Sequence, residues 1–343
     1  MIEDAWYRPQ VPWWLVPLSP LASAFTHLAE KRRKKLQLHQ ATLPKPVIVV
    51  GNIAVGGTGK TPFIQWLVTA LQSHGIQPGI ISRGYGGKPP VTPFEVVADG
   101  DVRETGDEPL LLKQKTKAPV FIDPDRVAAA KALLAKYPVD CLISDDGLQH
   151  YALPRDMEIV MVDGQRLLGN GRVFPLGPLR EPKERLHTVD WIIEKTVTPN
   201  HEPGRPLTSK VSSHGQLFVQ LQPPRFVGSD EVVPKGSAVH GVAGIGNPNS
   251  FFTGLRALGY QVIEHPFGDH HQFRPTDFHR QDNLPWVMTE KDWVKCRHLD
   301  LDQVAVAPLA PQVNEAAAHK ILTDIESLVA QKPKFNSTAE SSL

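Results

Sequence analysis

A short apolar run that leads into a glycine-rich turn constrains the fold of this chain more than any other feature. Residues 47–50 are all Val or Ile, and the segment GNIAVGGTGKT follows at residues 51–61, after which apolar residues recur at helical spacing. A strand, a loop of this kind and a helix, in that order, are the setting of a phosphate-binding loop (P-loop). Backbone N–H groups and the new helix N-terminus then converge on phosphate oxygens. The motif therefore predicts a nucleotide-binding α/β domain.

Individual residues of the loop have distinct expected roles. Lys60 is expected to reach the β- and γ-phosphates, and Thr61 is expected to ligate Mg²⁺. Ala54 stands where the strict pattern has glycine, but the remaining glycines keep the loop permissive. The expected nucleotide-binding residues are Gly56, Gly57, Thr58, Gly59, Lys60 and Thr61.

The base of the nucleotide is predicted from an element that the chain lacks. Guanine-specific proteins with this loop usually carry Asn-Lys-x-Asp, and the nearest segment, Thr289-Glu290-Lys291-Asp292, has the wrong spacing. ATP is favoured over GTP for this reason. The expected cofactors are ATP and Mg²⁺.

A second apolar run ends in two acids. Cys141, Leu142 and Ile143 are followed by Ser144, and then come Asp145 and Asp146. A strand that ends this way commonly delivers a carboxylate to the magnesium of a P-loop protein. Because neighbouring residues of a strand point to opposite faces, we expect only one of the two aspartates to face the metal. The sequence leaves open which one.

The order of predicted elements indicates an α/β fold with two domains. Short β-branched runs alternate with helical segments from residue 46, which is typical of a parallel sheet. Residues 195–213 are rich in Pro, Thr, Ser and Gly and predict a boundary. We expect a second unit with strands at 217–221, 238–243, 261–265, 286–288 and 304–306, and helices at 250–258 and 315–330.

The predicted fold is thus a P-loop NTPase-like parallel-sheet domain, a second, smaller α/β domain and an N-terminal interfacial helix. The expected segments are 1–38 for the membrane-interface segment, 39–205 for the P-loop domain, 206–332 for the second domain, which closes the active-site cleft, and 333–343 for a disordered tail.

Composition excludes several classes of function. With 37 Lys and Arg against 36 Asp and Glu, the overall charge gives no argument for nucleic-acid binding. Cys141 and Cys296 lie far apart and form no CxxC pair, so neither a zinc site nor a disulfide framework is expected. The apolar stretch 11–25 contains three prolines and is shorter than the roughly 20 residues a membrane-spanning helix needs. Any membrane contact is therefore expected to be peripheral.

The N-terminal residues carry the features of a membrane-interface anchor. Aromatic residues (Trp6, Tyr7, Trp13 and Trp14) precede an apolar stripe (Leu21, Phe25 and Leu28) and a basic run (Lys31, Arg32, Arg33, Lys34 and Lys35). Ser19 is the expected N-cap of the helix, with Pro20 at its first position. Such a helix can lie on an anionic membrane. Alternatively, the stripe packs on the protein's own core and the charges face water.

Four further segments place the two phosphate-site motifs in a family context. They are Ser82–Gly87 (SRGYGG), Gly106–Pro109 (GDEP), Phe174–Glu181 (FPLGPLRE) and Phe267–Phe273 (FGDHHQF). Together and in this order, they closely resemble the tetraacyldisaccharide 4'-kinase (lipid A 4'-kinase) family of Gram-negative bacteria. The resemblance covers nearly the whole chain.

The resemblance implies a reaction, a substrate and a location. The γ-phosphoryl group of ATP would pass to the 4'-hydroxyl of a tetraacylated glucosamine disaccharide 1-phosphate, a glycolipid, and the product would be lipid IVA of lipopolysaccharide biosynthesis. It also implies two α/β/α domains with the site in the cleft between them. The location would be peripheral, at the cytoplasmic face of the bacterial inner membrane.

The resemblance also assigns roles to residues. Asp107 would be the general base, paired with His270 from the second domain, and Arg180 would neutralise phosphate charge; Arg83 and Arg126 are weaker candidates. Glu108 or Asp146 would complete the magnesium environment that Thr61 and Asp145 belong to. The motif alignment alone favours His270 over His271.

Each of these roles has a structural alternative. Asp107 could simply start a helix, because an acid before proline is common at helix N-termini. His265, His270 and His271 could instead bind a metal ion. Arg180 could merely pair with Glu181 or Glu184.

Two other functions fit a P-loop chain that touches a membrane. The protein could be an ATPase switch that controls a partner, or a scaffold that binds nucleotide without turnover. A switch would hydrolyse ATP without lipid, whereas a kinase needs its lipid acceptor.

Overall fold

The computed structural model describes residues 2–8, 10–196, 213–280 and 282–332. The expected tail at 333–343 and most of the expected boundary at 195–213 lie outside the described residues. Within them, the strands form two sheets, and the predicted α/β class is confirmed.

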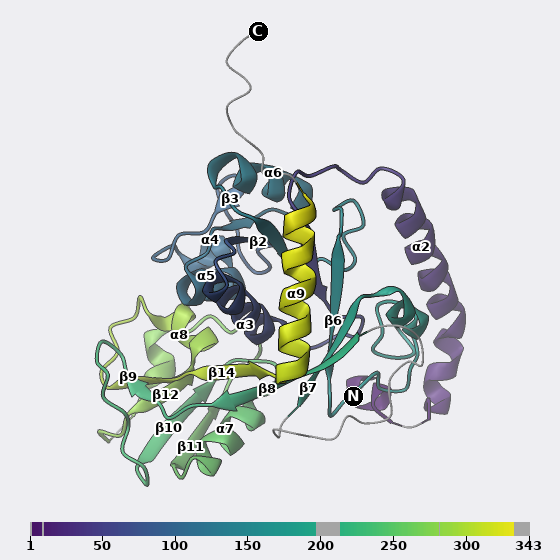
Figure 1. Cartoon of the computed structure of the whole chain (residues 1–343). Helices are drawn as coiled ribbons and strands as arrows, with labels where there is room; N and C mark the ends of the chain where they lie inside the picture. The colour runs from purple at the N-terminus through teal and green to yellow at the C-terminus, as the bar shows by residue number, and fades with distance from the viewer. Residues whose placement is uncertain (1, 9, 197–212, 281, 333–343) are drawn as a thin grey trace.

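A nine-stranded, mostly parallel sheet forms the larger part of the described chain (Figure 1), in the order β14-β8-β7-β6-β1-β5-β2-β4-β3. Val50 at the end of β1 pairs with Asp145 at the end of β5, so the P-loop and the acidic strand end lie side by side. The strands are β1 (Val47–Gly51), β2 (Pro78–Ser82), β3 (Phe94–Glu95), β4 (Val120–Ile122), β5 (Cys141–Asp145), β6 (Met157–Asp163), β7 (Trp191–Thr196), β8 (Ser213–Leu221) and β14 (Leu309–Val313).

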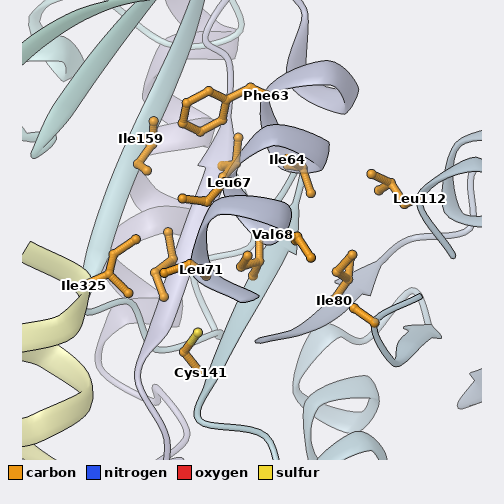
Figure 2. Close-up of a cluster of buried hydrophobic side chains, with 14 of the residues drawn as sticks. Phe63, Ile64, Leu67, Val68, Leu71, Ile80, Leu112, Cys141, Ile159 and Ile325 are labelled. Carbon is orange, nitrogen blue, oxygen red and sulfur yellow. The ribbon is translucent and has the colours of Figure 1, made fainter. Parts of the chain in front are cut away.

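The helix after the P-loop, α3 (Lys60–Ser73), is fixed by its apolar face. Phe63, Leu67 and Leu71 point toward Ile159 and Ile325 (Figure 2), and all five side chains are fully buried. Burying one such side chain contributes roughly 1.5–3 kcal/mol, so the start of α3 is held firmly against the sheet. The other helices of this part are α4 (Val102–Thr105), α5 (Asp107–Thr116), α6 (Arg126–Lys136), the 3-10 turn η2 (Lys183–Thr188) and α9 (Glu315–Gln331).

A five-stranded sheet, in the order β11-β10-β12-β13-β9, forms the second unit. It packs around the buried residues Phe252, Val287 and Ala305, and its helix α8 lies against α5 of the first unit (Figure 1). Its elements are β9 (Arg225–Phe226), β10 (Ala238–Ala243), α7 (Pro248–Ala257), β11 (Gln261–Pro266), the 3-10 turn η3 (Pro275–Phe278), β12 (Trp286–Thr289), α8 (Glu290–Cys296) and β13 (Val304–Ala307).

Two elements expected in the second unit belong to the first sheet. Strand 217–221 is part of β8, which pairs with β7, and helix 315–330 is α9, which packs on β8. Their assignment to the second sheet was wrong, because an apolar pattern identifies a strand or helix but not the sheet that receives it. The chain therefore leaves the first sheet after β8 and returns to it at β14. The division into domains at 205 and 206 itself remains a proposal.

The N-terminal region is α1 (Ile2–Trp6), the 3-10 turn η1 (Trp13–Leu18) and α2 (Ser19–Gln37), and α2 lies along the outside of the molecule (Figure 1). Leu18 takes the N-cap position and Ser19 is already helical, so the expected Ser19 cap was wrong. Pro20 does lie in the first turn. Among the described helices, none combines the length and hydrophobicity that crossing a bilayer requires.

Two of the three residues in the apolar stripe of α2 are mostly exposed, whereas the third, Phe25, packs edge-on against the Phe174 ring. Leu21 is 59% exposed and Leu28 is 65% exposed, and Trp13 in η1 is 83% exposed. The alternative that this stripe faces the core is therefore wrong for Leu21 and Leu28. Trp6, however, is buried, and its Nε1 donates a hydrogen bond to the Pro175 carbonyl at 3.0 Å. Trp6 consequently belongs to the core and not to an exposed aromatic surface.

Candidate active site

The P-loop is shaped by local backbone geometry and by one buried asparagine. Gly59, the N-cap of α3, has φ = 85°, a left-handed conformation that favours glycine. The buried Asn52 side chain donates to the Ala54 carbonyl at 2.6 Å and accepts a hydrogen bond from Lys60 Nζ at 3.3 Å. These contacts connect the start of the loop to its lysine and fix the loop's shape.

Two cations converge on Asp146, the second acid after β5. Lys60 Nζ lies 3.4 Å from its Oδ1, and Arg180 Nη1 lies 3.3 Å from its Oδ2. Burial acts to raise the pKa of Asp146, but these two cations outweigh it and lower the pKa. The site therefore brings together Lys60, Arg180 and an ionised Asp146.

Arg180 is positioned by the loop that precedes it. Its backbone N–H donates to the Ile53 carbonyl at 2.6 Å, so the 173–180 segment runs alongside the P-loop. Glu181 is instead bound by Gln149 and Tyr151 and by the guanidinium of Arg185. The alternative that Arg180 serves only to pair with Glu181 is therefore wrong.

Asp145 lies deeper than Asp146 and lacks a full set of partners. Ser82 Oγ donates to its Oδ2 at 3.1 Å, whereas its Oδ1 is buried without a hydrogen-bond partner. Burial, together with the negative charges of Glu108 and Asp146, raises the pKa of Asp145 to about 7. An added cation would relieve this accumulation of negative charge.

The raised pKa of Asp145 predicts a specific pH dependence of stability. Between about pH 4 and pH 7 the unfolded chain loses this proton and the folded chain keeps it, so folding stability falls as pH rises through that window. We expect Asp145→Asn to melt at a higher temperature than wild type near pH 8, and at a similar temperature near pH 4, in metal-free buffer. Thermal unfolding at the two pH values tests this. The same melting difference at both would contradict it, and Asp99→Asn, at an exposed carboxylate, is the control.

The two sheets meet at Asp107 and His270. Asp107 is the first residue of α5, as the helix-start alternative expected. Its buried side chain nevertheless reaches the other unit, because Oδ2 lies 3.0 Å from Nδ1 of His270. Gly106, which precedes Asp107, has φ = 80° and packs closely on the Tyr85 backbone, because a Cβ there would lie 2.5 Å from the Tyr85 carbonyl oxygen. The helix start and the cross-sheet pair are therefore compatible.

The neighbouring histidines have other partners. His271 Nε2 lies 3.0 Å from Asp277 Oδ2, and its ring stacks on Phe267. His265 Nε2 lies 2.9 Å from Nδ1 of His240. Of the three histidines in question, His270 is the one that faces Asp107.

No group of three or more His, Cys, Asp or Glu side chains that could hold a metal ion occurs within the described ranges. His265, His270 and His271 instead contact separate partners, His240, Asp107 and Asp277, which argues against a shared histidine metal site. Likewise, Asp145, Asp146 and Glu108 do not form such a cluster by themselves. A magnesium ion at a P-loop usually takes several of its ligands from water and from phosphate oxygens.

Sequence reasoning missed Lys291. Its Nζ lies 3.2 Å from Glu108 Oε1 and 3.6 Å from Asp107 Oδ2. Its segment, residues 289–292, resembles the guanine-recognition element only loosely, and this comparison gave no other role for the lysine. The available signal for a functional lysine was an acidic residue followed by a basic residue directly after the end of a strand.

One of the two weaker arginine candidates lines an open cavity of about 360 Å³, and the other contacts a residue of its lining. Arg83 lines this cavity together with Tyr85, whose ring centre is 5.4 Å from that of His270. Arg126 is buried, and its Nη1 donates to the carbonyl of Asp123, another lining residue, at 3.1 Å. The cavity therefore opens beside the Asp107–His270 pair.

The fold and the site define a P-loop phosphotransferase. The site has a glycine-rich loop with its lysine, an acidic strand end, and a pair of titratable side chains, one of which comes from the second unit. The model of the tetraacyldisaccharide-1-P 4'-kinase family matches residues 11–326. The chain belongs to this family, and it is a kinase. The resemblance seen in the motifs is thereby confirmed.

Individual relatives agree with the family match. A tetraacyldisaccharide 4'-kinase of Azotobacter vinelandii is 44% identical over 86% of this chain and 87% of its own length. One from Nitrosococcus oceani is 41% identical over 98% of both chains. The crystal structure of LpxK from Aquifex aeolicus in complex with ATP has a TM-score of 0.73 and 27% identity, and covers 92% of this chain and 98% of that one.

Proposed function

We propose that the protein transfers the γ-phosphoryl group of ATP to the 4'-hydroxyl of a tetraacylated glucosamine disaccharide 1-phosphate, which gives lipid IVA. Two observations carry this proposal: Lys60 and Arg180 converge on Asp146 at the end of β5, and the Asp107–His270 pair lies where the two sheets meet. Glu108, next to Asp107, is close enough to Asp145 for its charge to raise the pKa of that carboxyl, so the two groups are neighbours. Phosphoryl transfer requires mainly positioning and charge neutralisation, together with a group that accepts the proton of the attacking hydroxyl. This site supplies residues for each of these needs.

We assign the proton-accepting role to Asp107 and His270 as a unit. Asp107 Oδ1 accepts the backbone N–H of Glu108 at 2.9 Å, and Oδ2 is bound by His270. Because Asp107 is buried and His270 is 36% exposed at its side chain, the sugar hydroxyl would meet Nε2 of the ring. The Asp107 carboxylate would orient the ring and stabilise its charged form.

Mg²⁺ would be held at the ends of β1 and β5. The buried, unpartnered Oδ1 of Asp145 and the raised pKa of that residue fit a cation there. Thr61 and Asp146 would complete the protein's contribution, and Glu108 would act from farther out. The ion would supply charge neutralisation on the β- and γ-phosphates. Lys60 and Arg180, which both contact Asp146, would supply positive charge to the phosphates.

The cavity beside His270 would receive the acceptor. Arg83 and the nearby Arg126 provide positive charge, and Tyr85 is 67% exposed and provides an apolar face. A phosphorylated sugar needs both kinds of contact.

ATP turnover with and without the disaccharide 1-phosphate tests the proposed function. We expect turnover to depend on the lipid, and rapid turnover without it would favour the ATPase switch instead.

We place the protein on the cytoplasmic face of the inner membrane, bound through η1 and α2. The exposed apolar residues of this region lie next to the basic run 31–35, and basic residues near an anionic surface contribute about 1 kcal/mol each. Apolar insertion and charge together are the two signals that stable peripheral binding needs. Such binding would hold the enzyme beside a substrate whose acyl chains stay in the bilayer.

Point substitutions test this location better than deletion of residues 1–36, because Trp6 is buried and Tyr7 contacts the P-loop through the Val55 carbonyl. Combined Trp13→Ser, Leu21→Ser and Leu28→Ser should weaken sedimentation with anionic vesicles about tenfold or more, since each removes an exposed apolar side chain. ATP binding should be unchanged.

Val227→Ser, at an exposed apolar residue of the second unit, is the matched control and should sediment like wild type. Neutralising residues 31–35 should make vesicle binding less dependent on salt, because screening acts only on the charged contribution. Undiminished sedimentation of the triple variant would contradict the proposed location.

A further inference from the structure

One ammonium group lies among three carboxylates where the two sheets meet. Lys291 Nζ is 3.2 Å from Glu108 Oε1, 3.6 Å from Asp107 Oδ2 and 3.8 Å from Asp269 Oδ1. Asp107 and Glu108 begin α5 beside the large sheet, whereas Asp269 directly precedes His270 in the second unit. Lys291 therefore contacts Asp107 itself and the residue next to its histidine partner.

The backbone that carries Lys291 is held by contacts of its own. The Thr289 hydroxyl caps α8 by accepting the N–H of Asp292 at 3.0 Å. The fully buried Asp292 is neutralised by Lys295 Nζ at 2.7 Å, and Glu290 pairs with Lys115 of α5. Because these neighbours already have partners, the Lys291 side chain is the one that α8 presents to the carboxylates at the start of α5.

Lys291 and His270 bind the same oxygen of Asp107. The His270 ring reaches Oδ2 at 3.0 Å, and the ammonium group lies 3.6 Å from it. Side chains from the small sheet thus fix the carboxylate from two directions. Without the ammonium group, the Asp107, Glu108 and Asp269 carboxylates would repel one another, and Asp107 is buried, where an uncompensated charge is costly.

We propose that Lys291 is a positioning residue, which holds Asp107 and Asp269 together across the junction of the two sheets so that His270 meets Asp107 in the orientation that proton transfer needs. It also joins the start of α5 to the second unit at the point where the acceptor hydroxyl would arrive. The inference rests on the proposed function of the Asp107–His270 pair.

Steady-state kinetics of the full-length enzyme with ATP, Mg²⁺ and the disaccharide 1-phosphate test this role. Lys291→Met should lower kcat about 10²-fold, because a displacement of about 1 Å at a reacting group costs that much, and should leave KM for ATP little changed. Lys291→Arg keeps the charge and should recover part of the loss. In a His270→Ala background, Lys291→Met should cost little more, because groups that act through one another are not additive.

Lys115→Met is the matched control, because it removes another ion pair between α5 and α8 without touching Asp107. It should lower the melting temperature and leave kcat close to wild type. Should Lys291→Met fail to fold, Lys291→Gln replaces it with the same expectations. A kcat like that of wild type, or losses that multiply fully with His270→Ala, would overturn the inference. Absence of lipid phosphorylation by the wild type would overturn the proposed function as well.

Discussion

Replacing Asp107 and His270 together by alanine should lower kcat scarcely more than the worse of the two single replacements. The two side chains share one hydrogen bond, of 3.0 Å between Oδ2 and Nδ1, through which Asp107 orients the ring that would accept the proton. General base catalysis contributes about 10²–10⁴-fold, so each single variant should lose within that range. Removing the second group of a unit that is already disabled costs little.

The measurement is kcat for lipid phosphorylation by the two single variants and the double variant, each checked for an unchanged melting temperature. His271→Ala is the matched control, because this ring contacts Asp277 and Phe267 and does not reach Asp107. It should retain most of the activity. Losses that multiply across the Asp107 and His270 variants would show that these residues act in separate steps.

Lys60→Ala should lower kcat by about 10²-fold or more, comparable to the loss of one preorganised electrostatic donor at a reacting group. The ammonium group contacts Asn52 and Asp146 at the end of the P-loop, where it can reach the phosphate oxygens of ATP. The attraction between the ammonium group and the phosphate oxygens grows as negative charge shifts during phosphoryl transfer. Loss of Lys60 should therefore lower mainly kcat. Folding should change little, because the buried apolar face of α3 is untouched.

Activity assays paired with thermal unfolding check this prediction. Lys131→Ala on α6 removes an exposed lysine of the same unit and should behave like wild type. A Lys60→Ala variant that melts like wild type and keeps near-normal activity would contradict the assignment of the phosphate site.

The local part of the site was predictable because adjacent residues build it. The β1 strand, the loop and α3 follow one another without interruption, and β5 ends in its two acids, so a short window of sequence holds the whole pattern. The pairing of Asp107 with His270 spans 163 residues, and only the combined motifs indicated it. Periodicity alone cannot connect such distant segments.

Other features depended on tertiary contacts that no local pattern encodes. Trp6 was expected at the surface with the other tryptophans, yet the loop after Val173 buries it. The β8 strand was recognisable as a strand, but the sequence did not indicate that β7 and β14 lie on either side of it. Lys291 has an ordinary helix-start sequence, and its importance arises from carboxylates that another sheet contributes.

Incubating the purified protein with γ-labelled ATP, Mg²⁺ and the tetraacylated disaccharide 1-phosphate, and then separating the lipids, tests the central claim most directly. The account predicts a labelled lipid that carries a second phosphate at the 4' position, and predicts that the Asp107→Ala variant makes far less of it. Label released only as inorganic phosphate, at a rate that does not respond to the lipid, would contradict the account.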